Sequence, residues 1–172
     1  NNGKLVFSNT DKGTVANFDV NVDGNITVVS GVHLDYTYYA SNLPRGYNGG
    51  DPNWKMINDG NGNPKPVTNV DSIQKYGLKS SRDEAISSFL NAVKLETKPV
   101  ILMGDFNEPS FLDWTEKTKN NFNHHGVVIP WHNTLKLHQN GFVDVFREFY
   151  PNELENPGFT WPSATSKKKA TS

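Results

Sequence analysis

Val100-Ile101-Leu102-Met103-Gly104-Asp105-Phe106-Asn107 is the stretch of this sequence that decides the fold. The apolar run that follows Pro99 predicts a short central strand buried on both faces of a sheet. Asp105 then stands at the carboxyl end of that strand, where open α/β sheets bind ligands. Gly104 lets the backbone turn, and Asn107 adds an amide beside the carboxylate. Gly, Asp and Asn are also ordinary turn residues, so this stretch alone fits a simple turn equally well.

Two segments upstream of this stretch predict the elements that pack around it. Residues 15–22 and 26–34 alternate between apolar and polar side chains on either side of residues 23–25, which predicts a β-hairpin. Ser81-Arg82-Asp83-Glu84 has the form of a capping box, and the apolar spacing after it predicts a helix over residues 81–95. We expect Arg82 to serve the first turn of that helix. Hairpin, helix and buried strand together predict an α/β fold.

The remaining segments predict one long loop and one further helix. Residues 36–80 lack periodicity and are rich in Gly, Pro and Asn, so we expect a long loop that its aromatic side chains keep packed. Residues 159–161, Phe-Thr-Trp, predict a short strand or a packed loop, and Lys167-Lys168-Lys169 predicts a solvated tail. A late helix, stopped by Pro151, is predicted by apolar residues at helical spacing: Phe142, Val145, Phe146, Phe149 and Tyr150.

The composition is typical of one globular domain and excludes several classes of function. The 172 residues carry a net charge of -1, so tight sequence-independent binding of long nucleic acid, which needs a Lys/Arg excess, is not indicated. The absence of cysteine excludes disulfides and thiolate metal sites but does not determine the compartment. We expect no membrane span, because no apolar run approaches the roughly 20 residues that one requires. The expected location leans to secreted or periplasmic.

Four motifs of this sequence resemble motifs of the endonuclease/exonuclease/phosphatase family. That family includes deoxyribonuclease-I-like nucleases, sphingomyelinases, inositol-phosphate phosphatases and deadenylases. The apolar strand with Gly-Asp-Phe-Asn at residues 104–107 is similar to the family signature. Val32-His33-Leu34-Asp35 is similar to a strand that ends in an active-site histidine. Residues 141–144 and 159–161 resemble its late helix and Phe-Thr-Trp region. The resemblance implies a four-layer α/β/β/α sandwich, a mixed sheet pair flanked by helices.

The resemblance also implies a divalent-metal-dependent phosphoesterase that hydrolyses a phosphodiester or a phosphomonoester. Asp105 would orient or deprotonate the attacking water, and Asn107 would hold a phosphate oxygen or the metal's ligands. His33 would donate to a non-bridging phosphate oxygen and stabilise charge in the transition state. The implied cofactor is Mg²⁺, or else Mn²⁺ or Ca²⁺, with Asp105 and Asn107 as its ligands. The implied partner is a phosphorylated small molecule, a phospholipid headgroup or a short nucleic acid.

The departures from the family pattern concern its two ends. The family's early metal-binding glutamate and its late Asp-His pair have no counterpart, so we expect residues 1–172 to form a single partial domain, with the loop at about 36–80 inside it. We expect the chain alone to be weakly active or inactive as an enzyme, and we expect its uncovered sheet face to favour self-association. Two alternatives stay open: a non-catalytic fragment or binding module that retains the fold without a complete metal site, and an extracellular carbohydrate-binding module.

Several side chains outside these motifs have two interpretations each. Arg45 is a candidate substrate-binding residue because an arginine fork suits phosphate, and a solvated loop arginine is the alternative. Tyr36 could stack on a base or sugar, although loop packing explains it equally well. No zinc spacing links the late histidines, so surface positions are expected for His124, His125, His132 and His138.

Overall fold

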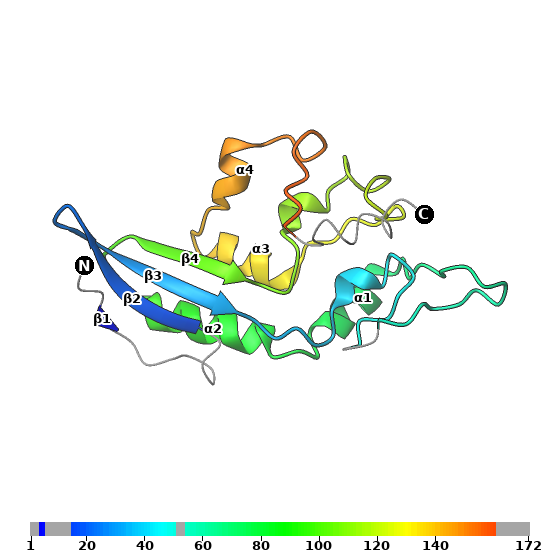
Figure 1. Ribbon diagram of the computed structural model, residues 1–172, viewed down its shortest axis with the longest axis horizontal. Coiled ribbons are helices and arrows are strands. Elements are labelled where there is room, and N and C mark those ends of the chain that lie inside the picture. Colours follow the sequence, from blue (N-terminus) through cyan, green and yellow to red (C-terminus); the bar gives the residue numbers. More distant parts are fainter. Residues whose placement is uncertain (1–3, 6–14, 51–53, 161–172) are drawn as a thin grey trace.

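The computed structural model describes residues 4–5, 15–50 and 54–160. Trp161 and the Lys167-Lys168-Lys169 run therefore lie outside the described residues. The described residues form strands and helices, as in an α/β protein (Figure 1), and two 3₁₀ turns. The elements in chain order are β1 (Lys4–Leu5), β2 (Val15–Val22), β3 (Asn25–His33), η2 (Ala40–Asn42), α1 (Val70–Gly77), α2 (Arg82–Val93), β4 (Val100–Asp105), η3 (Phe111–Asp113), α3 (His132–Gln139) and α4 (Val145–Phe149).

The four strands form one mixed sheet in the order β1-β2-β3-β4. β2 and β3 pair antiparallel, which confirms the predicted hairpin, and Asp23 adopts φ 50° in its turn. β4 then pairs with β3 in parallel, after the chain has crossed over through α1 and α2. Parallel pairing brings the carboxyl ends of β3 and β4 to the same edge of the sheet.

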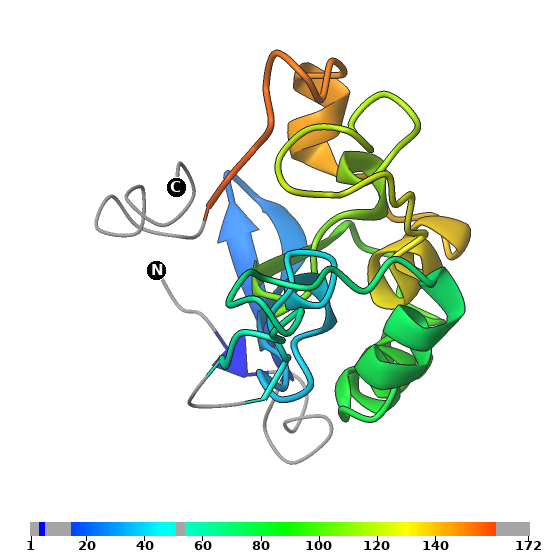
Figure 2. The same cartoon turned by 90° about the vertical axis from the view of Figure 1, so that its right-hand side faces the viewer.

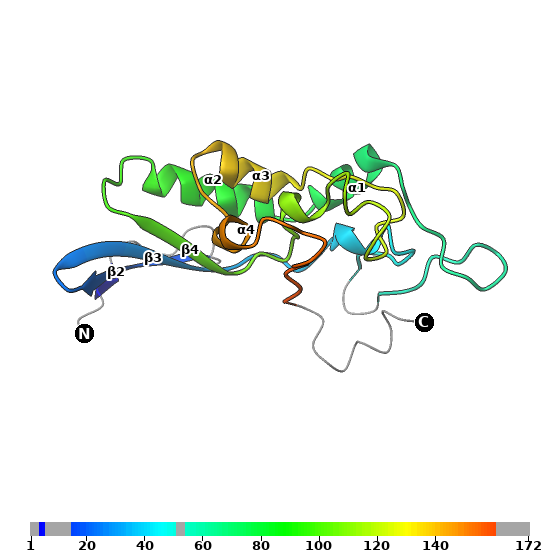
Figure 3. The same ribbon diagram turned by 90° about the horizontal axis from the view of Figure 1, so that it is seen from above.

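Helices α2 and α3 cover one face of this sheet (Figures 2 and 3). α2 confirms the helix predicted after residue 81, and its Ile86 and Phe89 are completely buried. Leu137 of α3, a helix that was not predicted from the sequence, joins them. The sheet contributes Val15 and Val32 from β2 and β3. Burial of these side chains removes apolar surface from water and holds the helices on the sheet.

The opposite face of the sheet is open in the part of the chain that the structure describes. Ile101 and Met103 are 46% and 51% exposed, so the prediction that β4 is buried on both faces is wrong. The reason is that β4 is an edge strand with helices on one side only. Phe18 of β2, 41% exposed, lies on the same open face, whereas Asn17 points into the buried face. The more apolar side of β2 is therefore the uncovered one, whereas Val28 and Val32 of β3 are buried on the covered face.

A second apolar cluster organises the segment predicted to be one long loop. α1 lies inside residues 36–80, so that prediction is wrong for its last part. Asn69 accepts a hydrogen bond from the amide of Ser72 and so caps α1, and this cap is the sequence signal that was available. Ile73 of α1 is fully buried in the cluster, where it joins Ala40, Leu43, Trp114, Val127, Ile129 and Trp131.

Arg82 lies between the two apolar clusters and does not have the role predicted for it in the first turn of α2. Its buried guanidinium donates to the carbonyl oxygens of Asp35 (2.7 Å), Thr37 (2.8 Å), Tyr38 (3.1 Å) and Gly77 (3.3 Å). It thereby fixes the chain just after β3 to the end of α1. The predicted capping box is also wrong, because Ser81 makes no side-chain cap.

Ser81 contacts Asp35 instead of the first turn of α2. The Ser81 amide and hydroxyl donate to Asp35 Oδ2 at 3.0 and 3.3 Å, and Thr37 donates to Asp35 Oδ1. Burial alone would raise the pKa of Asp35, but these hydrogen bonds outweigh it and hold that pKa below its ordinary value. Arg82 and Asp35 together make the connection after β3 a fixed part of the fold.

The predicted late helix is confirmed as α4, but its apolar stripe is not part of the core. Asp144 caps α4 by accepting from the amide of Arg147, and the helix ends before Pro151. Val145 and Phe149 are 64% and 75% exposed. With only five residues, α4 presents little apolar surface for packing, and it lies away from the sheet (Figure 1). Residues 159 and 160, at the start of the Phe-Thr-Trp segment, form irregular chain and not a strand.

Candidate active site

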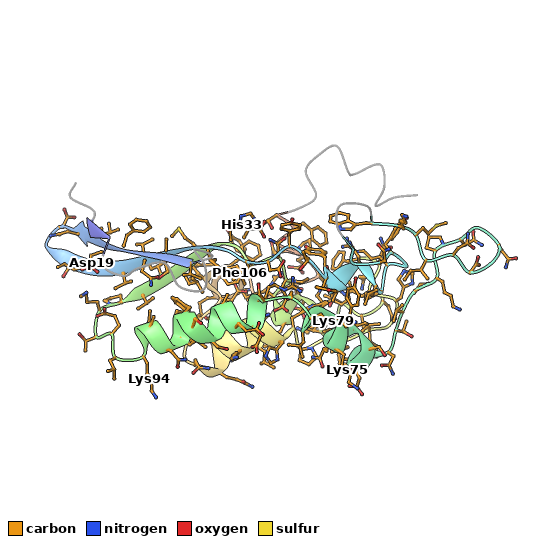
Figure 4. All side chains as sticks on the ribbon, turned by 90° about the horizontal axis from the view of Figure 1, so that it is seen from below. Asp19, His33, Lys75, Lys79, Lys94 and Phe106 are labelled. Carbon is orange, nitrogen blue, oxygen red and sulfur yellow. The ribbon has the colours of Figure 1, made fainter. Side chains whose placement is uncertain are left out.

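The register of β3 and β4 brings two of the predicted site residues together. His33, the last residue of β3, is paired with Asp105, the last residue of β4. His33 Nε2 lies 4.0 Å from Asp105 Oδ2, and both side chains are largely exposed. In Figure 4, His33 lies on the side of the strands turned away from α2, whereas Phe106 lies nearer the helices. The imidazole and the carboxylate thus stand side by side at the carboxyl edge of the sheet.

Gly104 allows this close approach. It adopts φ +139°, and a Cβ at this position would collide with the carbonyl oxygen of Val32 on β3. Only glycine combines that backbone angle with the absence of a side chain. The amide of Leu34 donates to the carbonyl oxygen of Asp105 at 2.8 Å, and this hydrogen bond holds the ends of β3 and β4 together.

Asn107 locks the turn after β4. Its backbone amide donates to Asp105 Oδ1 at 2.9 Å, and its side-chain Nδ2 donates to the carbonyl oxygen of Leu34 at 2.8 Å. Asn107 itself has φ 47°, an uncommon value for a residue with a side chain. With these bonds made, Asp105 Oδ2 and Asn107 Oδ1 are the acceptor atoms left for a ligand.

A cavity of about 570 Å³ opens beside this turn. That volume lies within the range of small-molecule sites, roughly 300–1,000 Å³. The wall combines the turn after β4, the start of the segment after β3, and residues from the second half of the chain. His33 stands outside the wall next to Asp105, and Tyr36, 54% exposed, is not part of it. The side chains that line the cavity include Tyr39, Ser41, Arg45, Asp105, Asn107, Glu108, Asp113, Trp114, Phe122, His124, Glu153 and Phe159.

Arg45 belongs to this wall and is not a solvated loop residue. Its side chain is partly buried, and its Nε has no hydrogen-bond partner among the described residues. Burial lowers the pKa of the guanidinium, while the neighbouring Tyr39 opposes that shift. The structure therefore brings Arg45 and Asp105 to one cavity although 60 positions separate them in the sequence.

His124 is buried in the same wall, so the prediction of surface histidines is wrong for it. Only 3% of His124 is exposed, and its ring stacks on Trp114 with the centroids 3.7 Å apart. Burial lowers its pKa from 6.5 to about 4, so the ring is neutral near pH 7. His132 is engaged elsewhere, since its Nε2 lies 2.8 Å from Asp83 Oδ1.

No role was predicted from the sequence for the buried acids of the cavity. Glu108 accepts hydrogen bonds from Asn133 and Thr134 at the start of α3, and burial raises its pKa against the opposing charge of Arg82. Asp113 is bound by Arg147, whose Nε donates to its Oδ1 at 2.7 Å. Glu153 accepts a hydrogen bond from Thr115 and lies near Lys117, so among the described acids of the wall Asp105 is the one with a carboxylate oxygen exposed beside His33.

These residues fit a hard cation in part. Mg²⁺ is commonly held by one or two carboxylates, with waters and substrate phosphates in its other positions, so Asp105 Oδ2 and Asn107 Oδ1 are suitable ligands. Within residues 4–5, 15–50 and 54–160, no three His, Cys, Asp or Glu side chains gather into a group that could hold a metal ion. The described residues therefore supply a partial ligand set.

Comparison with known proteins assigns the family. The model of the endonuclease/exonuclease/phosphatase family matches residues 7–168, so the chain belongs to this family, whose members are generally hydrolases of phosphoester bonds. An uncharacterized protein of Caenorhabditis elegans is 36% identical over 137 residues, which cover 76% of this chain and 37% of the nematode protein. The chain thus spans little more than a third of that relative. No solved structure matches significantly.

Proposed function

We propose that this chain carries the reaction centre of a divalent-metal-dependent phosphoesterase, acting on a phosphodiester or a phosphomonoester. The observation that supports this most is the placement of His33 beside Asp105 at the carboxyl edge of two parallel strands, open to a cavity. An exposed imidazole and an uncommitted carboxylate are the groups that phosphoester hydrolysis requires. Family membership supplies the reaction class, and this geometry supplies the residues.

Asp105 has two roles in this proposal, as a ligand of the metal and as the acceptor of a proton. Asp105 Oδ2 accepts the proton of the attacking water, since its other oxygen is bound by the Asn107 amide. The water oxygen bonds to phosphorus while His33 Nε2 donates to a phosphoryl oxygen on which negative charge builds. The ester P–O bond breaks on the far side, and the leaving oxygen takes a proton from solvent. Asn107 Oδ1 holds a water or cation beside the carboxylate. A bound Mg²⁺, Mn²⁺ or Ca²⁺ supplies positive charge to the phosphoryl oxygens.

A metal titration tests the proposal. We would measure Mg²⁺ and Mn²⁺ binding by calorimetry for the chain, for Asp105→Ala and for Glu155→Ala, an exposed carboxylate outside the cavity, as the matched control. Loss of binding in Asp105→Ala alone supports the metal site. Equal binding in all three proteins contradicts it. Hydrolysis of bis(p-nitrophenyl) phosphate and p-nitrophenyl phosphate then separates diester from monoester activity.

Weak or absent activity of the 172 residues alone remains part of the proposal, because the described residues supply only part of a metal-ligand set. Turnover well above the uncatalysed rate would contradict this part. The alternative, a binding module that retains the fold, is favoured by the same incomplete ligand set. It predicts phosphate-ester binding that needs no metal and does not change in Asp105→Ala.

The full four-layer sandwich is a further part of the proposal. The open face of β2, β3 and β4 carries Phe18, Ile101 and Met103, an apolar surface of the kind that a second sheet covers. Left uncovered, this face favours self-association of the chain. None of the described helices has the length and apolar character needed to cross a bilayer.

The substrate in this proposal is small. The net charge of -1 favours a phosphorylated small molecule, a phospholipid headgroup or a short nucleic acid over a long one. A cavity of about 570 Å³ has the volume for such a ligand.

A further inference from the structure

The chain contains three arginines, and the guanidinium groups of two of them each make several structural contacts. Arg82 donates to four carbonyl oxygens, and Arg147 binds Asp113 and the carbonyl oxygens of Tyr150 and Asn156. Arg45 differs from both. Across the described part of the chain its side chain makes no ion pair and no hydrogen bond, whereas Arg82, whose Nε is likewise unpartnered, donates through its other two nitrogens.

An unpaired, partly buried cation is unfavourable by itself. Water no longer solvates all of the guanidinium, which is why burial lowers its pKa, and no carboxylate among the described residues compensates for that loss. A ligand that brings an anionic oxygen restores the missing interaction. Charge-assisted bonds between a guanidinium fork and a phosphate are among the stronger hydrogen bonds in proteins.

Backbone hydrogen bonds fix the turn that carries Arg45 before any ligand arrives. The amides of Arg45 and Tyr47 donate to the carbonyl oxygen of Asn42 at 3.1 and 3.0 Å, and the amide of Ile57 donates to Gly46 at 2.7 Å. Gly46 adopts φ +82°, and a Cβ there would meet Pro64 at 2.6 Å. A fixed turn of this kind reduces the entropy lost when a ligand binds.

Arg45 also lies at a useful position relative to the reaction centre. Tyr39, in the same wall, is close enough to both for Arg45 to lower its pKa and for Asp105 to raise it, under a larger effect of burial that raises it. Tyr39, Arg45 and Asp105 therefore line one cavity. The volume of about 570 Å³ leaves room beyond a single phosphoryl group.

We propose that Arg45 binds a second phosphoryl group of the substrate while the reacting phosphoryl group lies at Asp105. The substrate class is then a small phosphoester with two phosphoryl groups, such as a nucleoside bisphosphate or a polyol bisphosphate. A headgroup that ends in a cation, such as choline, is disfavoured because Arg45 would repel it. The inference rests on the proposed function in one respect, the assignment of the reacting group to Asp105.

Calorimetric titration with matched ligands tests this inference without turnover. The probes are adenosine 3′,5′-bisphosphate against adenosine 5′-monophosphate, and myo-inositol 1,4-bisphosphate against myo-inositol 1-phosphate. We expect the unaltered chain to bind at least one bisphosphate about 10-fold or more tightly than its monophosphate, the gain expected of one or two charged hydrogen bonds. The pair that shows the gain identifies the nucleoside or polyol source.

Two substitutions assign the gain to Arg45. Arg45→Gln is expected to bring the affinity ratio close to one, whereas Lys65→Gln removes an equal charge from the same segment, outside the cavity, and is expected to leave it unchanged. Arg45→Lys keeps the charge without the fork and is expected to retain part of the gain, so it replaces Arg45→Gln if that variant fails to fold by circular dichroism. Equal affinities for mono- and bisphosphate in the unaltered chain, or a ratio that survives both Arg45 variants, would overturn the inference.

The Asp105→Ala variant separates this inference from the proposed function. If the bisphosphate preference depends on Arg45 and persists in Asp105→Ala while no phosphoester is hydrolysed, the Arg45 site stands and the proposed reaction fails. If hydrolysis is found but shows no dependence on a second phosphoryl group or on Arg45, the reaction stands and the inference fails.

Discussion

Replacement of Arg82 by methionine tests how the connection after β3 is held. The buried guanidinium donates to four carbonyl oxygens, two of them at 2.7 and 2.8 Å. Methionine fills much of the same space but donates no hydrogen bond. Counting only the two short bonds, at about 1.5–3 kcal/mol for each bond to a charged group, the free energy of unfolding should fall by about 3–6 kcal/mol. That is a large part of the roughly 5–15 kcal/mol that stabilises a typical domain.

Urea denaturation followed by circular dichroism measures this loss. If the free energy of unfolding decreases by roughly 2 kcal/mol per molar urea, the urea concentration at the unfolding midpoint should fall by roughly 1.5–3 M. Arg82→Lys keeps the charge but can reach fewer of the carbonyl oxygens, so an intermediate shift is expected. Lys75→Met removes an exposed cation from α1 and serves as the control, with almost no expected shift.

The reasoning is refuted if Arg82→Met lowers the midpoint by less than about 0.5 M. Such a result would mean that water satisfies the carbonyl oxygens once the guanidinium is removed. It would also mean that the connection after β3 is held by the Asp35 contacts with Ser81 and Thr37 instead.

Three further predictions concern pH, association and the strand ends. Because the pKa of His124 falls to about 4 on folding, the unfolded chain takes up a proton at His124 before the folded chain does. The free energy of unfolding should therefore decrease as pH falls from about 6.5 towards 4. Urea denaturation at a series of pH values should show a shallower decrease for His124→Gln than for the unaltered chain. Ile101→Lys with Met103→Lys should shift the chain towards monomer in light scattering, and an unchanged mass would count against association through the open face. Gly104→Ala should cost about 2–6 kcal/mol of stability, and a urea midpoint equal to that of the unaltered chain would show that β4 does not need glycine there.

Local patterns in the sequence predicted the elements, and the structure confirms most of them. The hairpin, α2, β4 and α4 each depend on spacing and turn chemistry within a few residues. His33 and Asp105 were singled out separately, and the parallel register of β3 and β4 then placed them together. Two features escaped prediction. α1 escaped notice because its Asn69 cap lies in a stretch crowded with Gly and Pro, and α3 gave no signal that we recognised.

Predictions about side-chain environment were less successful, because distant parts of the chain determine it. Arg82 and Ser81 bind the segment after β3 and not their own helix, and no pattern near residue 81 reveals that. His124 is buried because Trp114, ten positions earlier, stacks on it. β4 looked like an interior strand because its residues are apolar, although the described sheet ends there. Whether a strand is central or at an edge depends on its neighbours and not on its own composition.

The parallel pairing of β3 with β4 has a consequence for how the protein acquires its site during synthesis. His33 leaves the ribosome 72 positions before Asp105, a delay on the order of 4–14 s at about 5–20 residues per second. Throughout that interval the hairpin can form, but its outer edge has no β4 to pair with. An unpaired edge is open to strands of other nascent chains. Translation speed between these two residues should therefore influence the yield of soluble protein, and slowing the ribosome there by synonymous codons should lower it.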